Sequence, residues 1–434
     1  MDRFRSLACS AVVAVVVVAG VAAPIGAQTT PITPAQTDPA DAFFDDSVVH
    51  DVYLQINSKD WQSLKVHYLE NDYYTCDFRW RDQTLRNIAI RSRGTGSRSG
   101  VKPGLRVDFD RNVTDQKFLG LKSFILRNNT QDPSNMHERI AMQFFRRMEL
   151  PASREAHTRL YVNTVFVGMY TIVESVDKTF LRKNYGEDAG DLYKYDYNTD
   201  DKPYYLEYLG SDPALYVPHP FKPETNESHP RSEIVADMIR TINQDSDAIF
   251  KQTIAPFLGD LTRFVRHIAV EMFLADNDGF NGNYGTNNFY LYRFDNKNLF
   301  TFIAWDKSNA FIDGPTYPIF HGIYDQPEAI RNRLTMRVLG FPELKNLFLD
   351  TLIACASSLS ATLDPVPPAT TPADTRGWME REIEREYAQI KAGVYADPQK
   401  EYTNEAFEQE VEHLREFARQ RADFVRAEVA KARP

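Results

Sequence analysis

Two aspartates and one asparagine within residues 275–311 have the types and the order that metal-assisted phosphoryl transfer to a hydroxyl requires. Asp278 is followed five positions later by Asn283, and Asp306 comes at the end of a second β-rich run. In such chemistry one carboxylate orients the nucleophile, while an amide oxygen and a second carboxylate hold magnesium against nucleotide phosphates. The pattern makes Asp278 the candidate catalytic residue and makes Asn283 and Asp306 the candidate metal ligands.

The segments around these residues are predicted to bring them to one end of a β-hairpin. The apolar run 261–275 predicts a helix ahead of the motif. Two strands, 287–294 and 299–305, are then predicted around the polar turn 295–298. Asp306 follows the second strand directly, so the hairpin end is expected to gather two carboxylates and one amide oxygen. These are hard ligands suited to Mg²⁺ or Mn²⁺.

Two other interpretations apply to the same loop. Asp, Asn and Gly are common turn residues, and a turn explains Asp278 equally well when it is taken alone. The complete set, with Trp305–Asp306 at a strand end, favours a functional site. An EF-hand calcium loop that started at Asp276 would require glycine at its sixth position and glutamate at its twelfth. The sequence has Asn281 and Asn287 there, which excludes an EF-hand.

The overall charge and the cysteine content exclude several classes of protein. The net charge is −10 and the pI is about 5.5, so we expect no nucleic-acid partner. With 434 residues, the chain is long enough for one large domain or for two lobes that share a cleft. After removal of a leader, Cys76 and Cys355 remain, and they form neither a disulfide framework nor a zinc-binding pattern. Whether these two cysteines pair is left open.

The first 27 residues have the features of a secretory signal peptide. Arg3 and Arg5 supply the positive region, residues 8–20 supply the apolar run, and Gly26–Ala27 supply small residues for cleavage. A membrane anchor is the alternative, but the run is short and rich in alanine for a transmembrane helix. We therefore expect cleavage near Ala27 and no stable membrane span afterwards. The mature protein is expected to be secreted or otherwise extracytoplasmic, in a periplasm or at a cell surface.

Composition and periodicity indicate an α+β fold in five parts. Residues 48–109 alternate β-branched and aromatic with polar side chains, which predicts strands, and residues 135–150 predict a helix capped by Ser134. Further helices are predicted at 327–362, 374–395 and 403–432, the last with an apolar stripe expected to pack in the core. The five parts are a signal peptide (1–27), a disordered lead-in (28–45), a β-rich N-terminal lobe (46–183), a C-terminal lobe with the catalytic loop and metal-binding hairpin (184–363), and a Pro-rich break followed by C-terminal helices (364–434).

The chain also resembles a known family, the spore-coat protein H (CotH) kinases, which are secreted atypical kinases. The resemblance covers most of residues 48–355 and depends on the order and spacing of short motifs. These motifs are Arg91–Ser97, Lys102–Phe109, Leu126–Asp132, Tyr161–Asn163, Gly168–Tyr170 with Glu174, Gly190–Lys194, Asn277–Asn283, Asn288–Tyr292 and Trp305–Asp306. The resemblance implies a two-lobed, kinase-like fold with a mostly helical C-terminal lobe and with ATP and Mg²⁺ or Mn²⁺ between the lobes. It also implies phosphorylation of Ser or Thr in a protein substrate.

The same resemblance gives each candidate a role. Asp278 would accept or orient the proton of the substrate hydroxyl, and Asn283 and Asp306 would bind the metal. Backbone amides of a glycine-rich turn would cover the phosphates, because glycine permits close approach. An ordinary hairpin loop is an equally good interpretation of that turn. The turn residues are Arg93, Gly94, Gly96 and Ser97.

Charged residues of the N-terminal lobe complete the expected nucleotide site. Lys102 is the candidate cation for the α- and β-phosphates, with Arg93 and Arg106 as rivals. Glu138 would pair with that cation, as a kinase helix glutamate does, or would remain a surface charge. Glu174 would border the adenine pocket or would remain an acid at a strand end.

One departure from the family pattern keeps a second function open. Members commonly read Trp-Asp-x-Asp after the hairpin, but this chain has Ser308 at the position of the second Asp. A serine hydroxyl is a poorer metal ligand than a carboxylate, although Asp313 is close enough in sequence to compensate. The alternative function is therefore a non-catalytic pseudokinase that serves as a surface or coat protein. A metal-dependent hydrolase is disfavoured, because no histidine or third carboxylate is evident nearby.

Overall fold

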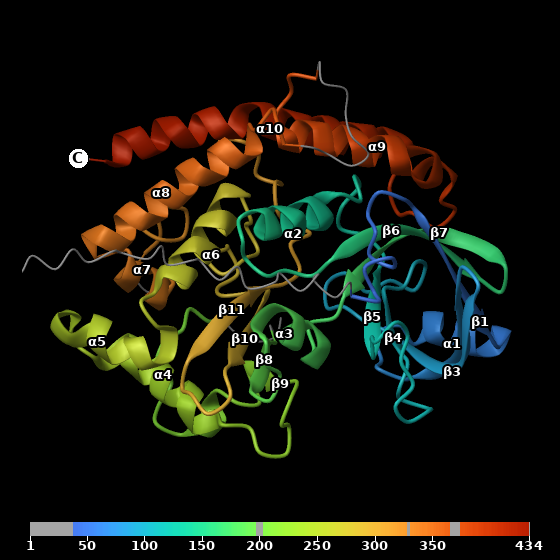
Figure 1. Ribbon diagram of the computed structural model, residues 1–434, viewed down its shortest axis with the longest axis horizontal. Coiled ribbons are helices and arrows are strands. Elements are labelled where there is room, and N and C mark those ends of the chain that lie inside the picture. Colours follow the sequence, from blue (N-terminus) through green and yellow to red (C-terminus); the bar gives the residue numbers. More distant parts are fainter. Residues whose placement is uncertain (1–37, 197–202, 328–329, 365–373, 434) are drawn as a thin grey trace, which may run out of the picture. The chain divides into compact units, whose positions relative to one another are not determined.

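The N-terminal half of the described chain folds into a closed barrel of seven β-strands (Figure 1). The computed structural model describes residues 38–196, 203–327, 330–364 and 374–433, so the predicted signal peptide lies outside the described residues. The strand order is β1-β2-β3-β4-β5-β7-β6, and parallel pairing of β1 with β6 closes the barrel. The strands are β1 (His50–Ile56), β2 (Tyr74–Trp80), β3 (Gln83–Ser92), β4 (Leu105–Asp108), β5 (Ser123–Arg127), β6 (Glu155–Val162) and β7 (Val165–Glu174), with helix α1 (Ser58–Val66) between β1 and β2.

Aromatic side chains fill the barrel, and one of them comes from the predicted lead-in. The Phe43 ring is fully buried, with its centroid 5.0 Å from that of Phe118 and 5.1 Å from that of Phe124. The expectation of disorder over 28–45 is therefore wrong for residues 38–45, the part that the structure describes. The Thr-, Pro- and Asp-rich composition suggested disorder, but the phenylalanines of this segment gain free energy when the barrel buries them.

A separate four-stranded antiparallel sheet, ordered β11-β10-β8-β9, contains the predicted hairpin. Strands β10 (Phe289–Arg293) and β11 (Phe300–Ala304) pair with Phe289 opposite Ala304, which confirms the two strands predicted from sequence. Strand β8 (Asp191–Tyr195) lies beside β10, and β9 (Phe221–Pro223) lies beside β8. The loop before β10 and the residues after β11 therefore meet at the open end of the hairpin.

Helices make up much of the remaining described chain, and none of them is both long and apolar enough to span a membrane. The prediction of one helix over 327–362 is wrong, because α7 and α8 share this range. Pro342 lacks a backbone N–H and therefore suits the first turn of α8. The helices are α2 (His137–Arg147), α3 (Lys178–Tyr185), η1 (Pro213–Leu215), α4 (Ser232–Gln244), α5 (Asp247–Leu258), α6 (Thr262–Phe273), α7 (Arg333–Val338), α8 (Pro342–Leu359), α9 (Trp378–Ala396) and α10 (Asn404–Ala432).

Helix α2 lies between β5 and β6 in sequence and joins the barrel to the helical part of the molecule. The rings of Phe144 in α2 and Phe273 in α6 stack with their centroids 5.4 Å apart. The predicted cap is wrong, because Met136 rather than Ser134 precedes the first helical residue. The Ser134 hydroxyl oxygen accepts a hydrogen bond from the Met136 amide at 3.1 Å and so stabilises the turn before the helix.

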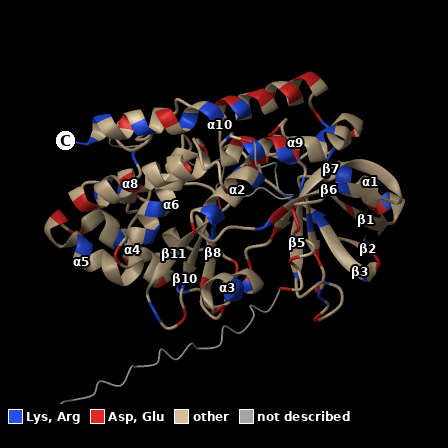
Figure 2. Cartoon of the chain, turned by 45° about the horizontal axis from the view of Figure 1, so that its top comes forward, with Lys and Arg blue, Asp and Glu red and all other residues tan. Residues whose placement is uncertain are grey.

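The predicted C-terminal helices are present and pack against the rest of the fold (Figure 1). Helix α9 contacts α2 and barrel strand β7, while α10 contacts α8 and α9. The apolar stripe of α10 is buried at Phe407, Val411 and Phe417, which confirms that it packs in the core. Both helices also carry charges of both signs (Figure 2), as where Arg415 Nε lies 2.7 Å from Glu384 Oε1.

The two cysteines of the described chain are free thiols in separate cores. Cys76 packs inside the barrel, and Cys355 packs among the helices. Burial raises the pKa of the Cys76 thiol to about 12, which makes it unreactive at neutral pH. The question of their pairing is therefore settled against a disulfide.

Truncation of the lead-in phenylalanine tests whether this segment belongs to the barrel. We expect Phe43→Ala to lower the free energy of unfolding by about 3–5 kcal/mol, because the variant leaves a cavity among buried rings. Val48 is 42% exposed and serves as the matched control, for which Val48→Ala is expected to cost less than about 0.5 kcal/mol. Urea denaturation measures both values, and equal stability of the two variants would contradict the packing of Phe43.

Candidate active site

A cavity of about 620 Å³ lies where the glycine-rich turn, the four-stranded sheet and the predicted catalytic loop meet. This size suits a small-molecule or cofactor site, for which roughly 300–1,000 Å³ is usual. Asp278 and Asp306 both line the cavity, together with turn residues 93–98 and Lys194 of β8. The structure thus brings together two of the three residues predicted for phosphoryl transfer and all four predicted turn residues.

The Asp278 carboxylate is held in place by three asparagine amides. Oδ1 accepts a hydrogen bond from Asn287 Nδ2 at 2.8 Å, and Oδ2 accepts from Asn288 Nδ2 at 3.0 Å and from Asn309 Nδ2 at 3.1 Å. Burial raises the pKa of Asp278, and the bond from Asn287 opposes this shift. A fixed carboxylate with a raised pKa is well suited to accept a proton from a hydroxyl.

A buried ionic cluster behind the Asp278 loop fixes its backbone. Lys307 Nζ lies 2.5 Å from Glu271 Oε1 and 2.8 Å from Asp276 Oδ2. The other Glu271 oxygen accepts a hydrogen bond from the Phe280 amide at 2.9 Å. Sequence reasoning missed this cluster, because its members come from a helix, a loop and the residue after Asp306. The position of Lys307 beside Asp306 was the one available signal.

Asp306 is constrained by both its backbone and its partners. Its φ of 50° lies in the left-handed region, which is uncommon for a non-glycine residue and often marks a functional site. Oδ1 accepts from Arg127 Nη1 at 2.8 Å and from Ser308 Oγ at 3.0 Å, whereas Oδ2 accepts from no group that the structure describes. Burial favours protonation, but Arg127 and Arg93 outweigh it and lower the pKa of Asp306 to about 2.

Arg127, rather than the predicted Lys102, is the cation that pairs with Glu138. The Arg127 guanidinium at the end of β5 forms an ion pair with Glu138 of α2, and both side chains are almost fully buried. Burial raises the pKa of Glu138 to about 7 in spite of this cation. Glu138 therefore has a cationic partner as expected, but the partner is an arginine from another strand. Neither residue lines the 620 Å³ cavity, and Asp306, which Arg127 contacts, is the cavity residue nearest to the pair in this network. The sequence contains many arginines, and none of the motifs singled out this one.

The assignment of Lys102 to the phosphates is wrong in this structure. Lys102 is fully buried, and its Nζ lies 2.7 Å from Asp397 Oδ2 in the connection between α9 and α10. It does not line the 620 Å³ cavity. The rival Arg106 is also occupied, since its Nε donates to Asp108 Oδ1 at 2.9 Å. The partner of Lys102 lies so far along the chain that local spacing gave no sign of it.

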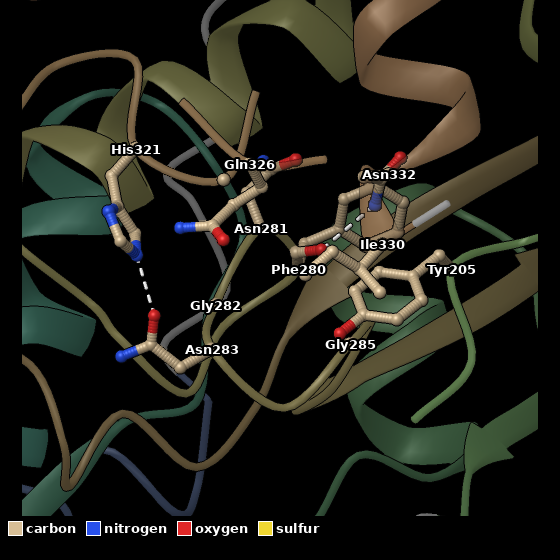
Figure 3. A pocket seen from close by; sticks show the side chains of 11 residues that line it. Tyr205, Phe280, Asn281, Gly282, Asn283, Gly285, His321, Gln326, Ile330 and Asn332 are labelled. Atoms are coloured by element: carbon tan, nitrogen blue, oxygen red, sulfur yellow. Dashed lines mark hydrogen bonds between the residues drawn. The ribbon is translucent and has the colours of Figure 1, made fainter. Parts of the chain in front are cut away.

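Asn283 does not reach the carboxylates either. Its Oδ1 accepts a hydrogen bond from His321 Nε2 at 2.6 Å, and the residue lines a second, smaller pocket (Figure 3). The loop turns it away, because the Asn283 amide donates to Asn277 O at 2.8 Å and Gly282 bridges to Gly285. A Cβ on Gly282 would collide with the Asn277 carbonyl, so this turn requires glycine. Asn287, Asn288 and Asn309 are the amide residues that lie with Asp278 instead.

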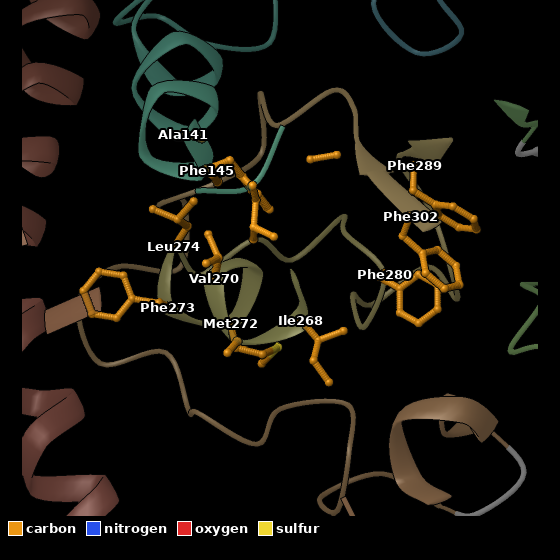
Figure 4. Close-up of a cluster of buried hydrophobic side chains, with 14 of the residues drawn as sticks. Ala141, Phe145, Ile268, Val270, Met272, Phe273, Leu274, Phe280, Phe289 and Phe302 are labelled. Atoms are coloured by element: carbon orange, nitrogen blue, oxygen red, sulfur yellow. The ribbon is translucent and has the colours of Figure 1, made fainter. Parts of the chain in front are cut away.

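The same loop is anchored to the hydrophobic core by Phe280 (Figure 4). The Phe280 ring centroid lies 4.9 Å from that of Phe302 on β11 and 5.1 Å from that of Phe289 on β10. Phe280 follows Asp278 by two residues and is fully buried. The hairpin and the Asp278 loop therefore form one packed unit, and this fixes Asp278 relative to Asp306.

The glycine-rich turn presents its backbone to the cavity. Gly94 has a φ of 114°, and a Cβ there would lie 2.6 Å from Ser97 Oγ, so the turn needs glycine at this position. Arg98 secures the turn by donating to Gly94 O at 2.7 Å and to Tyr68 O at 3.0 Å. The guanidinium of Arg93 lies over the Trp305 ring, 5.8 Å from its centroid.

Glu174 is placed away from the cavity. It ends β7 and is buried, and its Oε2 accepts from the backbone and Nε of Arg154 at 3.0 and 3.1 Å. Among the residues that line the 620 Å³ cavity, Glu174 is absent. The prediction that Glu174 borders the adenine pocket is therefore wrong. The alternative, an acid at a strand end, is correct, but this acid is buried and ion-paired rather than at the surface.

Ser308 and Asp313 do not supply a second carboxylate at Asp306. The Ser308 hydroxyl donates a hydrogen bond to Asp306, and the Ser308 backbone carbonyl accepts one from His137 Nδ1 at 3.0 Å. Asp313 accepts from Asn277 Nδ2 at 3.0 Å and does not line the cavity. The loss of the second Asp is therefore not compensated at this position.

The residues at the cavity fit a magnesium or manganese ion that also binds phosphates. Within the described ranges, no three His, Cys, Asp or Glu side chains form a cluster that could hold a metal. Magnesium commonly uses one or two carboxylates together with substrate phosphates, which is the donor set that Asp306 and Asp278 provide. Asp306 Oδ2 and the amide oxygens of Asn287 and Asn309 accept no described hydrogen bond and are the available oxygens.

The chain matches one family model and is similar to other known proteins. The family model described as CotH kinase protein matches residues 90–357. The chain is 25% identical over 380 residues to inner spore coat protein H of Bacillus subtilis (strain 168), covering 86% of this chain and 95% of that protein. The crystal structure of the proinflammatory kinase CtkA of Helicobacter pylori aligns with 76% of this chain and 94% of its own, with a TM-score of 0.30 and 9% identity.

Removal of the buried cation tests the Arg127–Glu138 pair. We expect Arg127→Met to lower the free energy of unfolding by about 3–5 kcal/mol, because it leaves Glu138 buried without its partner. The double variant Arg127→Met/Glu138→Leu should recover most of this loss, since no unpaired charge remains. Denaturant unfolding checks both, and a double variant no more stable than the single one would contradict the pairing.

His137 predicts a pH dependence of stability. Its two ring nitrogens face acceptors, the Ser308 carbonyl and Glu410 Oε1, each at 3.0 Å, so both are satisfied as donors only by the protonated ring. Although burial opposes protonation, Asp132 and Glu410 raise the pKa of His137 above its ordinary value of 6.5. The stabilisation is thus complete below pH 6.5 and is lost as the pH rises through the raised pKa.

The variant His137→Gln checks this pH dependence. We expect the difference in unfolding free energy between wild type and His137→Gln to shrink as the pH rises above 6.5, through the raised pKa of His137. Urea denaturation at several pH values measures it. A difference that is constant or grows with pH would show that His137 is neutral in the folded protein.

Proposed function

Because the chain belongs to the CotH kinase family, we propose that it is an atypical protein kinase. It transfers the γ-phosphate of ATP to Ser or Thr hydroxyls of an extracytoplasmic protein. The observation that carries the proposal is the meeting of Asp278, Asp306 and the glycine-rich turn in one cavity of about 620 Å³. The buried Arg127–Glu138 pair beside Asp306 supports it, since protein kinases place a cation and a helix glutamate in the same relation.

Asp278 accepts or orients the proton of the acceptor hydroxyl. Its carboxylate is fixed by Asn287, Asn288 and Asn309, so the oxygens are already in position when the acceptor binds. Burial favours the protonated form of this acid, which increases its strength as a base. Proton transfer of this kind contributes about 10²–10⁴-fold to a rate.

Asp306 binds Mg²⁺ or Mn²⁺, with the amide oxygens of Asn287 and Asn309 as further candidates in place of Asn283. When bound, the ion neutralises charge on the nucleotide phosphates. Arg127 keeps Asp306 ionised at all physiological pH values, because it holds the pKa of that carboxyl near 2. The backbone of residues 93–97 covers the phosphates from the barrel side.

The barrel and the helical part correspond to the two lobes of a kinase in this proposal. The N-terminal lobe comprises residues 46–183, with the barrel and α2, and the C-terminal lobe comprises residues 184–363. The cavity is lined by side chains from both parts, which supports ATP binding between them. Helices α9 and α10, the described helices beyond residue 374, contact both parts.

Secretion and a surface location complete the proposal. The N-terminal 27 residues support export, with cleavage near Ala27. The Bacillus subtilis relative is an inner spore coat protein, which supports a coat or surface location for this chain as well. An exported protein that carries Ser or Thr acceptors is the expected partner.

A pseudokinase is the second candidate, and Ser308 is the observation that favours it. The serine supplies no second carboxylate, and neither Asp313 nor Asn283 reaches the cavity. A pseudokinase and a kinase can both bind nucleotide, so only phosphate transfer separates them. Wild-type protein that is stabilised by ATP and Mn²⁺ yet transfers no phosphate would favour the pseudokinase.

Replacement of the two aspartates tests the kinase directly. We expect Asp278→Asn to reduce incorporation of radiolabelled phosphate into the protein itself or into a Ser/Thr peptide library by about 10²–10⁴-fold. Asp306→Asn should reduce it at least as much, because the metal loses its carboxylate ligand. Asn283→Ala is the matched control and should retain wild-type transfer, since Asn283 lies in the second pocket. Labelling that survives in both aspartate variants would refute the proposed function.

A further inference from the structure

Two cations line the 620 Å³ cavity without an ion-pair partner among the residues that the structure describes. Arg93 extends from the end of β3, and Lys194 extends from β8, so they come from different sheets. Neither side chain forms a hydrogen bond or a salt bridge with any group in the described part of the chain, apart from the contact of Arg93 with the Trp305 ring. Both are partly buried, which makes an unpaired charge costly.

The other cations that line the cavity have hydrogen-bond or ion-pair partners. Arg91 donates to Asn71 Oδ1 at 2.9 Å, and Arg98 donates to three backbone carbonyls of the turn and its surroundings. Lys222 lies opposite Lys194 on the adjacent strand, and its Nζ is 3.1 Å from Glu224 Oε1. Arg93 and Lys194 therefore differ from their neighbours in having no hydrogen-bond or ion-pair partner for the side chain within the described ranges, although acids such as Glu224 lie nearby.

Like charges that share a cavity oppose one another. Burial lowers the pKa of Lys194, and the charge of Arg93 lowers it further, so the two groups are close enough to interact. Asp306 attracts both, but its Oδ1 is already occupied by Arg127 and Ser308. A bound anion between the two cations would relieve this repulsion and would satisfy donors that are otherwise left desolvated.

We propose that Arg93 and Lys194 form a clamp that binds the polyphosphate of a nucleotide from two sides. The inference rests on the proposed function, because it places the phosphates between the glycine-rich turn and Asp306. The clamp makes Lys194 a phosphate-binding residue of β8. An acidic side chain of the acceptor protein is a different ligand for the same cations, and the experiment below separates it from a polyphosphate.

Lys194 on β8 and Arg93 are connected through two aromatic residues of the hairpin. Lys194 pairs in register with Tyr290 of β10, whose ring lies 5.3 Å from that of Trp305. Trp305 in turn carries Arg93 over its ring. Trp305 lines the cavity with both cations and Asp306, and Tyr290 packs against Trp305 outside the cavity lining.

Binding of three probes to four proteins tests the clamp. Isothermal titration would measure ATP, inorganic tripolyphosphate and adenosine, each with Mg²⁺, on wild type, Lys194→Ala, Lys194→Arg and Lys222→Ala. We expect Lys194→Ala to weaken ATP and tripolyphosphate about 10- to 100-fold, as for loss of a charged hydrogen bond. Adenosine binding should not change. Lys194→Arg should restore most of the affinity, and Lys222→Ala, which removes an ion-paired lysine from the same cavity, should change it less than about 3-fold.

Other results of these titrations would refute the clamp, and they show whether the proposed kinase function fails with it. Wild type that binds ATP while Lys194→Ala binds it equally well refutes the clamp and leaves the kinase proposal intact. An equal loss for adenosine shows that Lys194 supports the fold of the site rather than phosphate. A Lys194→Ala variant that binds ATP normally but needs a higher concentration of an acidic acceptor peptide assigns the cation to the acceptor. Wild type that binds neither ATP nor tripolyphosphate refutes both proposals.

Discussion

The interaction on which the candidate site depends is the bridge that Arg127 makes between Glu138 and Asp306. The arginine ends a barrel strand, the glutamate begins α2, and the aspartate follows the hairpin of the second sheet, so one guanidinium joins three separate elements. Burial of the Arg127 and Glu138 side chains is costly, and it is tolerable because each has a partner of opposite sign, while Asp306 remains partly exposed. The bridge therefore specifies one relative placement of the barrel, α2 and the hairpin, at the point where the cavity lies.

The C-terminal helices extend the same constraint around the outside of the site. Asp397 binds Lys102, which follows the glycine-rich turn, and Glu401 accepts a hydrogen bond from Ser99 in the same segment. Glu382 of α9 lies 2.8 Å from Arg139, the residue after Glu138 in α2. These contacts come from residues beyond the 90–357 segment that matches the family model. The family segment thus contains Asp278, Asp306 and the glycine-rich turn, and the C-terminal helices hold the turn and α2 in position.

The sequence predicted the parts of the site that depend on local order along the chain. Asp278, the hairpin and Asp306 are close in sequence, and the structure places the two aspartates together as expected. The errors concern long-range pairing and loop direction. Lys102 and Asp397 are separated by 295 positions, and no local pattern distinguishes a lysine that faces a buried acid from one that faces phosphate. Asn283 has the right spacing, but the Gly282–Gly285 turn reverses its direction, and spacing alone does not record direction.

The charges around the cavity bear on the replacement of the second Asp by Ser308. Protein kinases that bind two metal ions use both of them to neutralise phosphate charge, and a second carboxylate is needed to hold the second ion. This chain has a hydroxyl there that donates a hydrogen bond to Asp306. It also places at the same cavity two cations, Arg93 and Lys194, that form no ion pair with any described residue. Fixed cations in a preorganised site stabilise transferred phosphate without the cost of binding a second ion. The exchange of an acid for a serine is therefore consistent with transfer assisted by one metal ion, in which side chains supply the remaining positive charge.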